Sequence, residues 1–344
     1  MQIDLTRYFY LCVPIFERMK RLLQRLCLAL LLAASLFSCK TKEEKKESVH
    51  IGNAIYYWRT TFELDSTELG FLQRHNIERI YLRMFDVAEE FNPDENRFEA
   101  VPIATTRFVS DQLEEISKDI EIVPTVYITL NALRAMRNKE DEYAWLLVER
   151  LRAMASYNGC QTIREMQFDC DWTTQTRESY VALCRAARRL LQADKIELSI
   201  TIRLHQLKEE APPVDRGVLM IYNTGTLKHS KTRNSILDIA DVHPYLSKRK
   251  CNIPLDYAYP AFGWGVKFWN GQFRGIVSHP ENEELNEGET IRIERPTARE
   301  VKAIKSLIET ALGAPSRYRI LYHLDKEQLK YYRDYEISKI YSNN

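Results

Sequence analysis

Eight short runs rich in β-branched and aromatic residues, each followed by a segment of helical length, constrain the fold of this chain more than any other feature. These runs are residues 54–61, 79–87, 122–130, 165–172, 197–205, 217–224, 253–266 and 318–325. Parallel strands need a long crossover between them, which a helix usually supplies, so the alternation predicts a parallel α/β fold. Eight such units in about 290 residues favour a (β/α)8 TIM barrel. An open doubly wound sheet is the alternative, but no glycine-rich phosphate-binding turn follows the first run.

Local signals support this assignment. Residues 65–68 and 297–300 have the pattern of capping boxes, and residues 178–193 carry apolar side chains on one helical face. Residues 269–272, Trp-Asn-Gly-Gln, predict a hairpin turn. This turn belongs to an excursion after the seventh strand that runs to about Glu294. In a barrel, such an excursion lies on the side where active sites form.

The first 38 residues have the features of a secretory signal peptide. Lys20 and Arg21 precede the apolar run 28–37, and Met19 is a better start than Met1 for a leader of this length. An uncleaved membrane anchor is the alternative, although the run is shorter than the roughly 20 residues that a span needs.

The leader ends in Leu36-Phe37-Ser38-Cys39, which resembles a bacterial lipobox. The resemblance implies that Cys39 carries lipid and that a polar tether, residues 39–52, connects it to a single barrel domain, residues 53–344. The protein would then be anchored to the bacterial cell envelope at the outer membrane, on its periplasmic or surface face, and would contact the membrane only through the lipid. Acids after Cys39 resemble the surface-export signals of some lipoproteins.

Charge and cysteine content exclude some classes of function. The chain has 49 Lys+Arg and 48 Asp+Glu, a net charge of +1, which gives no support to a nucleic-acid partner. The barrel segment contains Cys160, Cys170, Cys184 and Cys251 without zinc-type spacing, and we predict no metal or cofactor. Export permits a disulfide, but the pattern favours buried thiols.

The fourth strand, residues 166–172, places two acids two positions apart in an apolar run. Strand faces alternate, so one face carries Phe168, Cys170 and Trp172 and the other carries Gln167, Asp169 and Asp171. Carboxylates are rarely buried without partners. The pair therefore predicts either the polar mouth of a barrel or a buried ion-pair network.

Two further strands contribute to the same lumen. Ser199, Thr201, Arg203 and His205 alternate with aliphatic residues in the fifth strand, and in the second strand Arg83 shares the face of Tyr81 and Phe85. The expected lumen residues are Arg83, Gln167, Asp169, Asp171, Arg203 and His205. Asp86, Asp171 and His205 stand at the carboxyl ends of strands, the positions that carry catalysis in this fold.

Each candidate has two interpretations. Asp171 and Asp169 can act as a general acid or base tuned by arginine, or can neutralise buried arginines in a structural network. Asp171 is nearer the mouth and favours catalysis, whereas Asp169 favours structure and His205 fits either role. Arg83 and Arg203 suit contacts with substrate or scaffold, since arginine stays protonated.

A resemblance to a known family rests on two of these strands. The run Phe168-Asp169-Cys170-Asp171-Trp172 resembles the fourth-strand motif of the chitinase-like family-18 glycoside hydrolases, in which two spaced aspartates lead to a catalytic glutamate. Residues 219–223, Leu-Met-Ile-Tyr-Asn, resemble the Met-x-Tyr-Asp segment of that family's sixth strand. The resemblance implies a carbohydrate ligand and places Tyr222 and Asn223 against it.

The chain departs from the family pattern at both motifs. Thr173 stands where the catalytic glutamate would be, and Asn223 replaces an aspartate. Threonine cannot supply the proton that a leaving glycosidic oxygen needs. Residues 169–173 and 258–264 also resemble uncharacterised exported barrel proteins, a similarity that implies the fold and leaves the function open.

Aromatic residues near the strand ends suit a sugar-binding cleft, because a ring with a polar tip fits a surface that is partly apolar and partly wet. The candidates are Trp58, Tyr222, Tyr257, Tyr259, Trp264 and Trp269. Core packing is the alternative, and it is favoured for Trp172. For Trp264 and Trp269 both interpretations stay open.

The sequence thus leaves two main hypotheses. The barrel is a glycoside hydrolase with Asp171 as acid or base and Asp169 as its modulating neighbour, or it binds a glycan or another extracellular ligand without cleaving it. A structural envelope protein is a third, weaker interpretation.

The leader generates one direct prediction. Mass spectrometry of the mature protein should find an acylated Cys39 at its N-terminus, because the apolar run and the lipobox-like end occur together. An unmodified N-terminus at another position would contradict the lipoprotein hypothesis.

Overall fold

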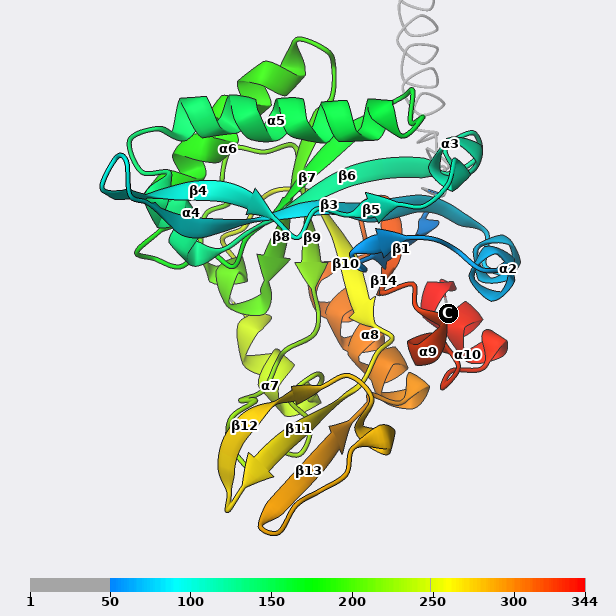
Figure 1. Ribbon diagram of the computed structural model, residues 1–344. Coiled ribbons are helices and arrows are strands. Elements are labelled where there is room, and N and C mark those ends of the chain that lie inside the picture. Colours follow the sequence, from blue (N-terminus) through cyan, green and yellow to red (C-terminus); the bar gives the residue numbers. More distant parts are fainter. Residues whose placement is uncertain (1–49, 248, 344) are drawn as a thin grey trace, which may run out of the picture. The chain divides into compact units, whose positions relative to one another are not determined.

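A closed parallel barrel forms the body of the protein in a computed structural model that describes residues 50–247 and 249–343 (Figure 1). Its eight strands are β1 (Gly52–Tyr57), β3 (Ile77–Asn92), β6 (Glu121–Ile128), β7 (Glu165–Asp169), β8 (Glu197–Arg203), β9 (Arg216–Met220), β10 (Leu255–Pro260) and β14 (Tyr318–Tyr322). Strand β1 pairs with both β3 and β14, which closes the sheet. The predicted TIM barrel is confirmed, and the open sheet is excluded.

Helices surround the barrel, with α5 and α6 side by side along one flank (Figure 1). They are α2 (Ser66–Arg74), α3 (Gln112–Ile116), α4 (Leu130–Ala135), α5 (Glu140–Tyr157), α6 (Arg177–Gln192), α7 (Ile239–Val242), α8 (Ala298–Leu312), α9 (Lys326–Leu329) and α10 (Asp334–Tyr341). Three short 3-10 helices are η1 (Leu204–Lys208), η2 (His243–Tyr245) and η3 (Pro280–Asn282). Both predicted capping boxes are present, at the first turns of α2 and α8.

Strand β3 is much longer than its barrel portion. Its second half leaves the barrel and pairs antiparallel with β4 (Arg97–Ile103), from Asp86 opposite Ile103 to Asn92 opposite Arg97. The prediction of a strand that ends at Val87 therefore missed a hairpin. A two-stranded sheet of β2 (Thr61–Phe62) and β5 (Arg107–Phe108) completes this side.

The excursion after the seventh barrel strand is a three-stranded antiparallel sheet. It consists of β11 (Trp264–Trp269), β12 (Gln272–Val277) and β13 (Glu289–Glu294), with β11 in the centre. The predicted hairpin turn is confirmed, with positive φ angles of 47° at Asn270 and 76° at Gly271. A single strand over residues 253–266 was wrong, because the barrel strand β10 ends at Pro260 and a separate strand, β11, begins at Trp264.

The remaining expectations concern parts outside the barrel strands. The four cysteines of the described residues are buried and free, as the pattern favoured. No helix among residues 50–247 and 249–343 is long and apolar enough to cross a membrane. The leader and Cys39 lie outside the described residues.

Buried ion pairs fill the amino-terminal end of the barrel. Arg79 contacts Glu165 at 2.5 Å and Glu121 at 2.8 Å, and Arg216 contacts Asp256 at 3.0 Å. The side chains of Arg79, Glu165, Arg216 and Asp256 are at most 4% exposed. Burial raises the pKa of Glu165, and the neighbouring guanidinium groups oppose that shift. Removal of one partner would leave an uncompensated buried charge.

We expect Glu165→Gln to lower the free energy of unfolding by about 3 kcal/mol, near the lower end for a broken buried pair, because Arg79 keeps Glu121. Urea unfolding followed by circular dichroism measures the change. Glu115→Gln, which breaks an exposed pair with Lys118, is the control and should leave the free energy of unfolding almost unchanged. Equal losses in the two variants would contradict a structural role for the buried network.

Candidate functional site

Two aspartates and an arginine meet at the carboxyl end of the barrel. Asp169 ends β7, Asp171 follows it, and Arg203 ends β8. Arg203 Nε donates a hydrogen bond to Asp171, its Nη2 lies 3.8 Å from Asp169 Oδ1, and Thr201 Oγ1 donates to Asp169 at 2.5 Å. The expectation that both acids share the lumen with Arg203 is confirmed.

Strand alternation produces this arrangement. Gln167, two residues before Asp169, accepts a hydrogen bond from Tyr56 OH (2.7 Å) across the lumen. On the opposite face, Trp172 is 1% exposed and its ring lies 6.3 Å from that of Tyr180 on α6. Trp172 therefore belongs to the core between barrel and helices, as expected, and it holds the strand that carries the acids.

The two acids differ in their surroundings. Burial raises the pKa of Asp169 to about 6, with Arg203 opposing and Asp171 adding to the shift. The side chain of Asp171 is 44% exposed, whereas that of Asp169 is 5% exposed. Asp171 thus reaches the solvent side of the cluster, and Asp169 lies beneath it.

Tyr127 of β6 is a site residue that the sequence interpretation missed. It pairs with Asp169 in the β6–β7 register, which places the phenol beside the cluster. Burial raises its pKa to about 12, and the charges of Asp171 and Asp169 add to the shift. It directly follows apolar Val126 in the strand, so alternation could have identified it as a lumen residue.

Arg83 and Asp86 form a second ion pair of the lumen. Arg83 donates from Nε and Nη2 to the two Asp86 oxygens at 2.7 and 2.6 Å. The predicted shared face of Arg83 and Phe85 was wrong, because Met84 is an extra residue in the β3–β6 register. Beyond this bulge Phe85 faces the helices, where Arg150 lies over its ring.

His205 was also misplaced by the sequence interpretation. Strand β8 ends at Arg203, and His205 is exposed in η1. The turn arises because the Gln206 side chain accepts from Arg203 N–H (2.8 Å) and donates to Trp172 O (2.8 Å). Partial burial of its ring lowers the pKa of His205, and the Asp171 charge opposes this shift.

An aromatic arc occupies the other half of the mouth. The Tyr322 ring lies 4.7 Å from Tyr222, 5.5 Å from Phe262 and 5.8 Å from Trp58. These residues follow or end β14, β9, β10 and β1, whereas the charged residues belong to β3 and β8 or end and follow β7. Arg203 joins the two halves, since its guanidinium lies 5.5 Å from the Tyr222 ring centroid.

The other aromatic candidates are distributed more widely. Trp264 donates from Nε1 to Glu294 (2.8 Å), and Trp269 is 42% exposed at the far end of β11. Tyr257 and Tyr259 point toward α8, with hydroxyl bonds to Gly313 O and Glu309, and do not line a cleft. Tyr322 and Phe262 were not among the predicted site residues.

The two positions that depart from the family motifs lie near the mouth. Thr173 is half-buried, and its backbone N–H donates to Thr176 Oγ1 at 3.0 Å. Asn223 is exposed with a φ of 55°. Neither position offers a carboxyl group.

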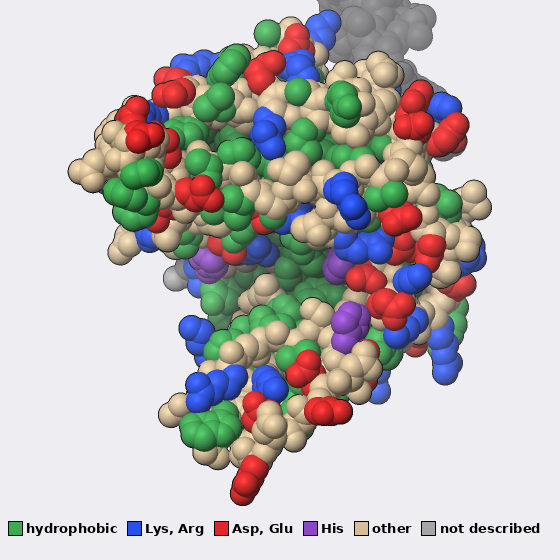
Figure 2. Space-filling model, in the orientation of Figure 1, with side chains coloured by type: hydrophobic (Ala, Val, Ile, Leu, Met, Phe, Trp, Pro, Cys, Tyr) green, Lys and Arg blue, Asp and Glu red, His purple; other side chains and the backbone are tan. Residues whose placement is uncertain are grey.

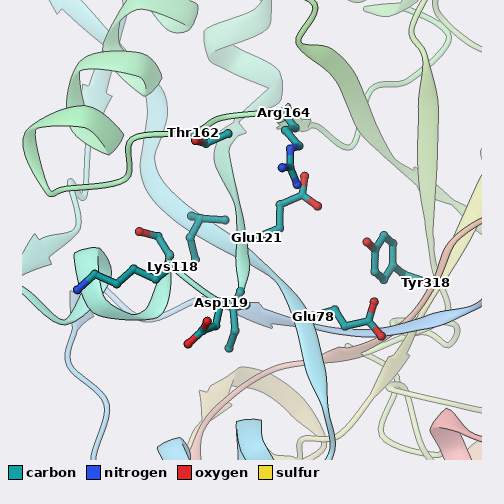
Figure 3. Close-up of a pocket in the computed structure, with 10 residues that line it drawn as sticks. Glu78, Lys118, Asp119, Glu121, Thr162, Arg164 and Tyr318 are labelled. Atoms are coloured by element: carbon teal, nitrogen blue, oxygen red, sulfur yellow. The ribbon is translucent and has the colours of Figure 1, made fainter.

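Figure 2 shows a hollow between the barrel and the three-stranded sheet, with apolar side chains on its floor and histidines at its border. A second depression, of about 420 Å³, lies at the opposite end of the barrel, where Glu78, Glu121 and Tyr318 begin their strands (Figure 3). Its lining mixes acids with Lys118 and Arg164. Among the described residues, no group of three or more His, Cys, Asp or Glu side chains could hold a metal ion.

The fold is similar to those of several solved carbohydrate-active enzymes. The chitinase of Chromobacterium violaceum matches with a TM-score of 0.57 at 11% identity, covering 86% of this chain and all of that one. The spore cortex-lytic enzyme SleL of Bacillus megaterium matches at 0.55 and 14%, covering 86% and 75%, and the GH18 chitinase ChiB of Flavobacterium johnsoniae at 0.53 and 11%, covering 86% and 95%. No protein-family model and no curated protein matches the sequence. The similarity is therefore one of fold.

The raised pKa of Asp169 generates a prediction on stability. The ordinary value of 3.8 rises to about 6 on folding, so the native state binds the proton more tightly and stability falls as the pH rises from about 4 to 6. Asp169→Asn should remove this fall and, above pH 6, exceed the wild type by up to about 3 kcal/mol. Thermal melts from pH 4 to 7 measure the difference, with exposed Asp94→Asn as the control. Parallel pH profiles for wild type and Asp169→Asn would contradict the prediction.

Proposed function

We propose that the barrel binds a glycan at its mouth without cleaving it. The observation that carries this proposal is the Arg203–Asp171 ion pair next to Thr173. Arg203 holds the more exposed of the two acids, and the position of the family's proton donor has a hydroxyl group. Hydrolysis needs a carboxylic acid that reaches the glycosidic oxygen, and mechanisms without assistance from the substrate also need a second carboxyl group about 5–9 Å away.

The acidic side chains of the mouth already accept hydrogen bonds from other side chains of the protein. Asp86 accepts both hydrogen bonds of Arg83, Asp171 accepts from Arg203, and Asp169 accepts from Thr201. Each of these acids therefore already accepts at least one hydrogen bond from a protein group. A binding site gains from the same contacts, because they fix the orientation of the polar groups before the ligand arrives.

The mouth has an aromatic half and a charged half, and this combination supports a carbohydrate ligand. The arc of Trp58, Tyr222, Phe262 and Tyr322 offers ring faces for the apolar side of a sugar, and the charged half offers hydrogen-bonding groups for hydroxyls. The structural neighbours are named as chitinases and a cortex-lytic enzyme, which supports a glycan as the ligand class. With the predicted lipid at Cys39, the barrel would hold this glycan at the bacterial envelope.

Hydrolysis is the second candidate, and Asp169 favours it. A carboxyl group with a pKa of about 6 carries its proton for part of the time near neutral pH, as a general acid requires. Asp169 is 3% exposed, however, so a substrate does not reach it in this arrangement, and it would act only as the modulating neighbour of Asp171. In this candidate Asp171 is the residue that exchanges the proton with the substrate.

A glycan panel assayed for both binding and cleavage tests the proposal. We expect the wild type to bind at least one oligosaccharide and to release no product. Asp171→Asn should weaken binding by about tenfold, since one charge-assisted contact is worth roughly 1.5–3 kcal/mol. The same variant should lose about 1 kcal/mol of stability or less, because the pair with Arg203 is half exposed.

Asp215→Asn is the matched control. Asp215 also accepts from an arginine, Arg188 at 2.7 Å, but it precedes β9 at the opposite end of the barrel. It should lose stability and keep glycan affinity. Cleavage by the wild type that falls 10²-fold or more in Asp171→Asn would overturn the binding proposal and establish the hydrolase.

A further inference from the structure

Trp264, the first residue of β11, lies next to the aromatic arc of the mouth. Its ring centroid is 5.4 Å from that of Phe262, and the Phe262 centroid is in turn 5.5 Å from that of Tyr322. Phe262 is 6% exposed, whereas Trp264 and Tyr322 are both half-buried. A buried ring therefore lies between two accessible ones, and the second accessible ring belongs to the three-stranded sheet.

Glu294, the last residue of β13, holds the Trp264 indole. The two residues are paired in the β11–β13 register, and Trp264 Nε1 donates to Glu294 Oε2 at 2.8 Å. Ser235 Oγ donates to the same oxygen, and Arg292 Nε donates to Glu294 Oε1 at 2.7 Å. The Glu294 side chain is fully buried, so three donors fix one carboxylate that water does not reach.

Arg292 extends this network to the loop after β9. Its guanidinium donates to the backbone oxygens of Leu227 (3.0 Å), His229 (2.7 Å) and Ser230 (3.2 Å). Both ends of the guanidinium are thus bonded, to Glu294 on one side and to the loop on the other. The carboxylate cannot shift without breaking these contacts, and the indole that it holds is therefore fixed before a ligand arrives.

The backbone between Phe262 and Trp264 is held as closely as the indole. A Cβ at Gly263 would lie 2.6 Å from Glu294 O, so only glycine fits here without a shift of β13. On the other side, the Gly263 N–H donates to Gln328 Oε1 at 2.9 Å. The two rings that flank Gly263 consequently keep a fixed separation.

We propose that Glu294 is a positioning residue: by orienting the Trp264 indole, it sets the affinity for glycan chains that extend from the mouth onto the three-stranded sheet. The ligand class is then an oligosaccharide long enough to reach from Tyr322 across Phe262 to Trp264. Because the indole N–H is bonded to a buried carboxylate, the accessible part of Trp264 is its apolar ring system, which suits the apolar face of a sugar. Such a chain would follow the hollow between the barrel and the sheet (Figure 2). This inference rests on the proposed binding of a glycan at the mouth.

The orientation of the indole can be followed without a ligand. Glu294→Gln keeps the shape of the side chain but replaces one acceptor oxygen with an NH2 group. The charged guanidinium of Arg292 attracts the remaining oxygen, so the NH2 group faces the indole N–H and two donors oppose each other. In nuclear magnetic resonance spectra, we expect the indole N–H signal of Trp264, identified by its absence from Trp264→Phe, to shift and to exchange faster with solvent in Glu294→Gln.

Calorimetric titration of the full chain with a chitin disaccharide and a chitin hexasaccharide tests the effect on affinity. We expect Trp264→Ala and Glu294→Gln to bind the hexasaccharide about tenfold more weakly than the wild type and the disaccharide within about twofold, because only the longer chain reaches the sheet. Trp264→Phe breaks the same bond without stranding a charge, and it should also weaken binding of the hexasaccharide if Glu294→Gln fails to fold. Ser235→Ala is the matched control, since it removes a donor to Glu294 and leaves the indole bond intact, and it should stay within about twofold for both probes.

The outcomes separate this inference from the proposal for the mouth. Hexasaccharide bound as tightly by Trp264→Ala and Glu294→Gln as by the wild type would overturn the positioning role and leave the mouth proposal standing. An unchanged indole signal in Glu294→Gln, an equal loss in Ser235→Ala, or equal losses for the two probes would overturn it as well. A wild type that binds neither chitin probe also overturns it, whereas the mouth proposal fails only if the whole glycan panel is negative.

Discussion

A charged side chain buried inside a closed barrel needs an oppositely charged partner within the barrel, and ion pairs of this kind lie at both ends of the lumen. At the amino-terminal end, Arg79 and Arg216 are matched by Glu165 and Asp256. At the mouth, Arg203 is matched by Asp171 and approaches Asp169. Between the two layers, Tyr56 and Gln167 satisfy each other. The desolvation cost of each ion is offset only by good geometry, so the strands are held in one register.

Strand alternation predicted part of this arrangement, and two local irregularities limited it. It placed Asp169, Asp171 and Arg203 correctly, because β7 and β8 are regular up to those residues. It failed at Phe85, where the extra residue Met84 shifts every later side chain to the other face. It failed again at His205, where the Gln206 side chain turns the chain into a 3-10 helix. The alternation of side chains that precedes a bulge or such a turn is regular. The sequence pattern therefore gives no sign of either irregularity.

The aromatic half of the mouth depends on barrel closure, which no single strand encodes. Tyr322 touches Trp58 and Phe262 because β14 pairs with both β1 and β10. These residues are far apart in the sequence, and each also fits a core position. The eight strands were predictable from their composition and spacing. The contacts of Tyr322 with residues at the ends of β1 and β10 could be known only from the closed sheet. The hairpin of β3 and β4 was missed because β3 continues from the barrel into the hairpin without a break that would mark the boundary.

The bulge at Met84 has a functional consequence. In a regular strand, residues three apart point to opposite faces, so Arg83 and Asp86 could not meet. The extra residue lets Asp86 accept two hydrogen bonds from Arg83, and the Asp86 charge adds to the raised pKa of Asp169. The bulge that made the prediction for Phe85 wrong therefore also leaves Asp86 with both carboxylate oxygens bonded to Arg83. Asp171 in turn accepts from Arg203, so the acids of the mouth serve as hydrogen-bond acceptors within the protein. Because the acids of the mouth are engaged in this way, we favour a barrel that binds a sugar over one that cleaves it.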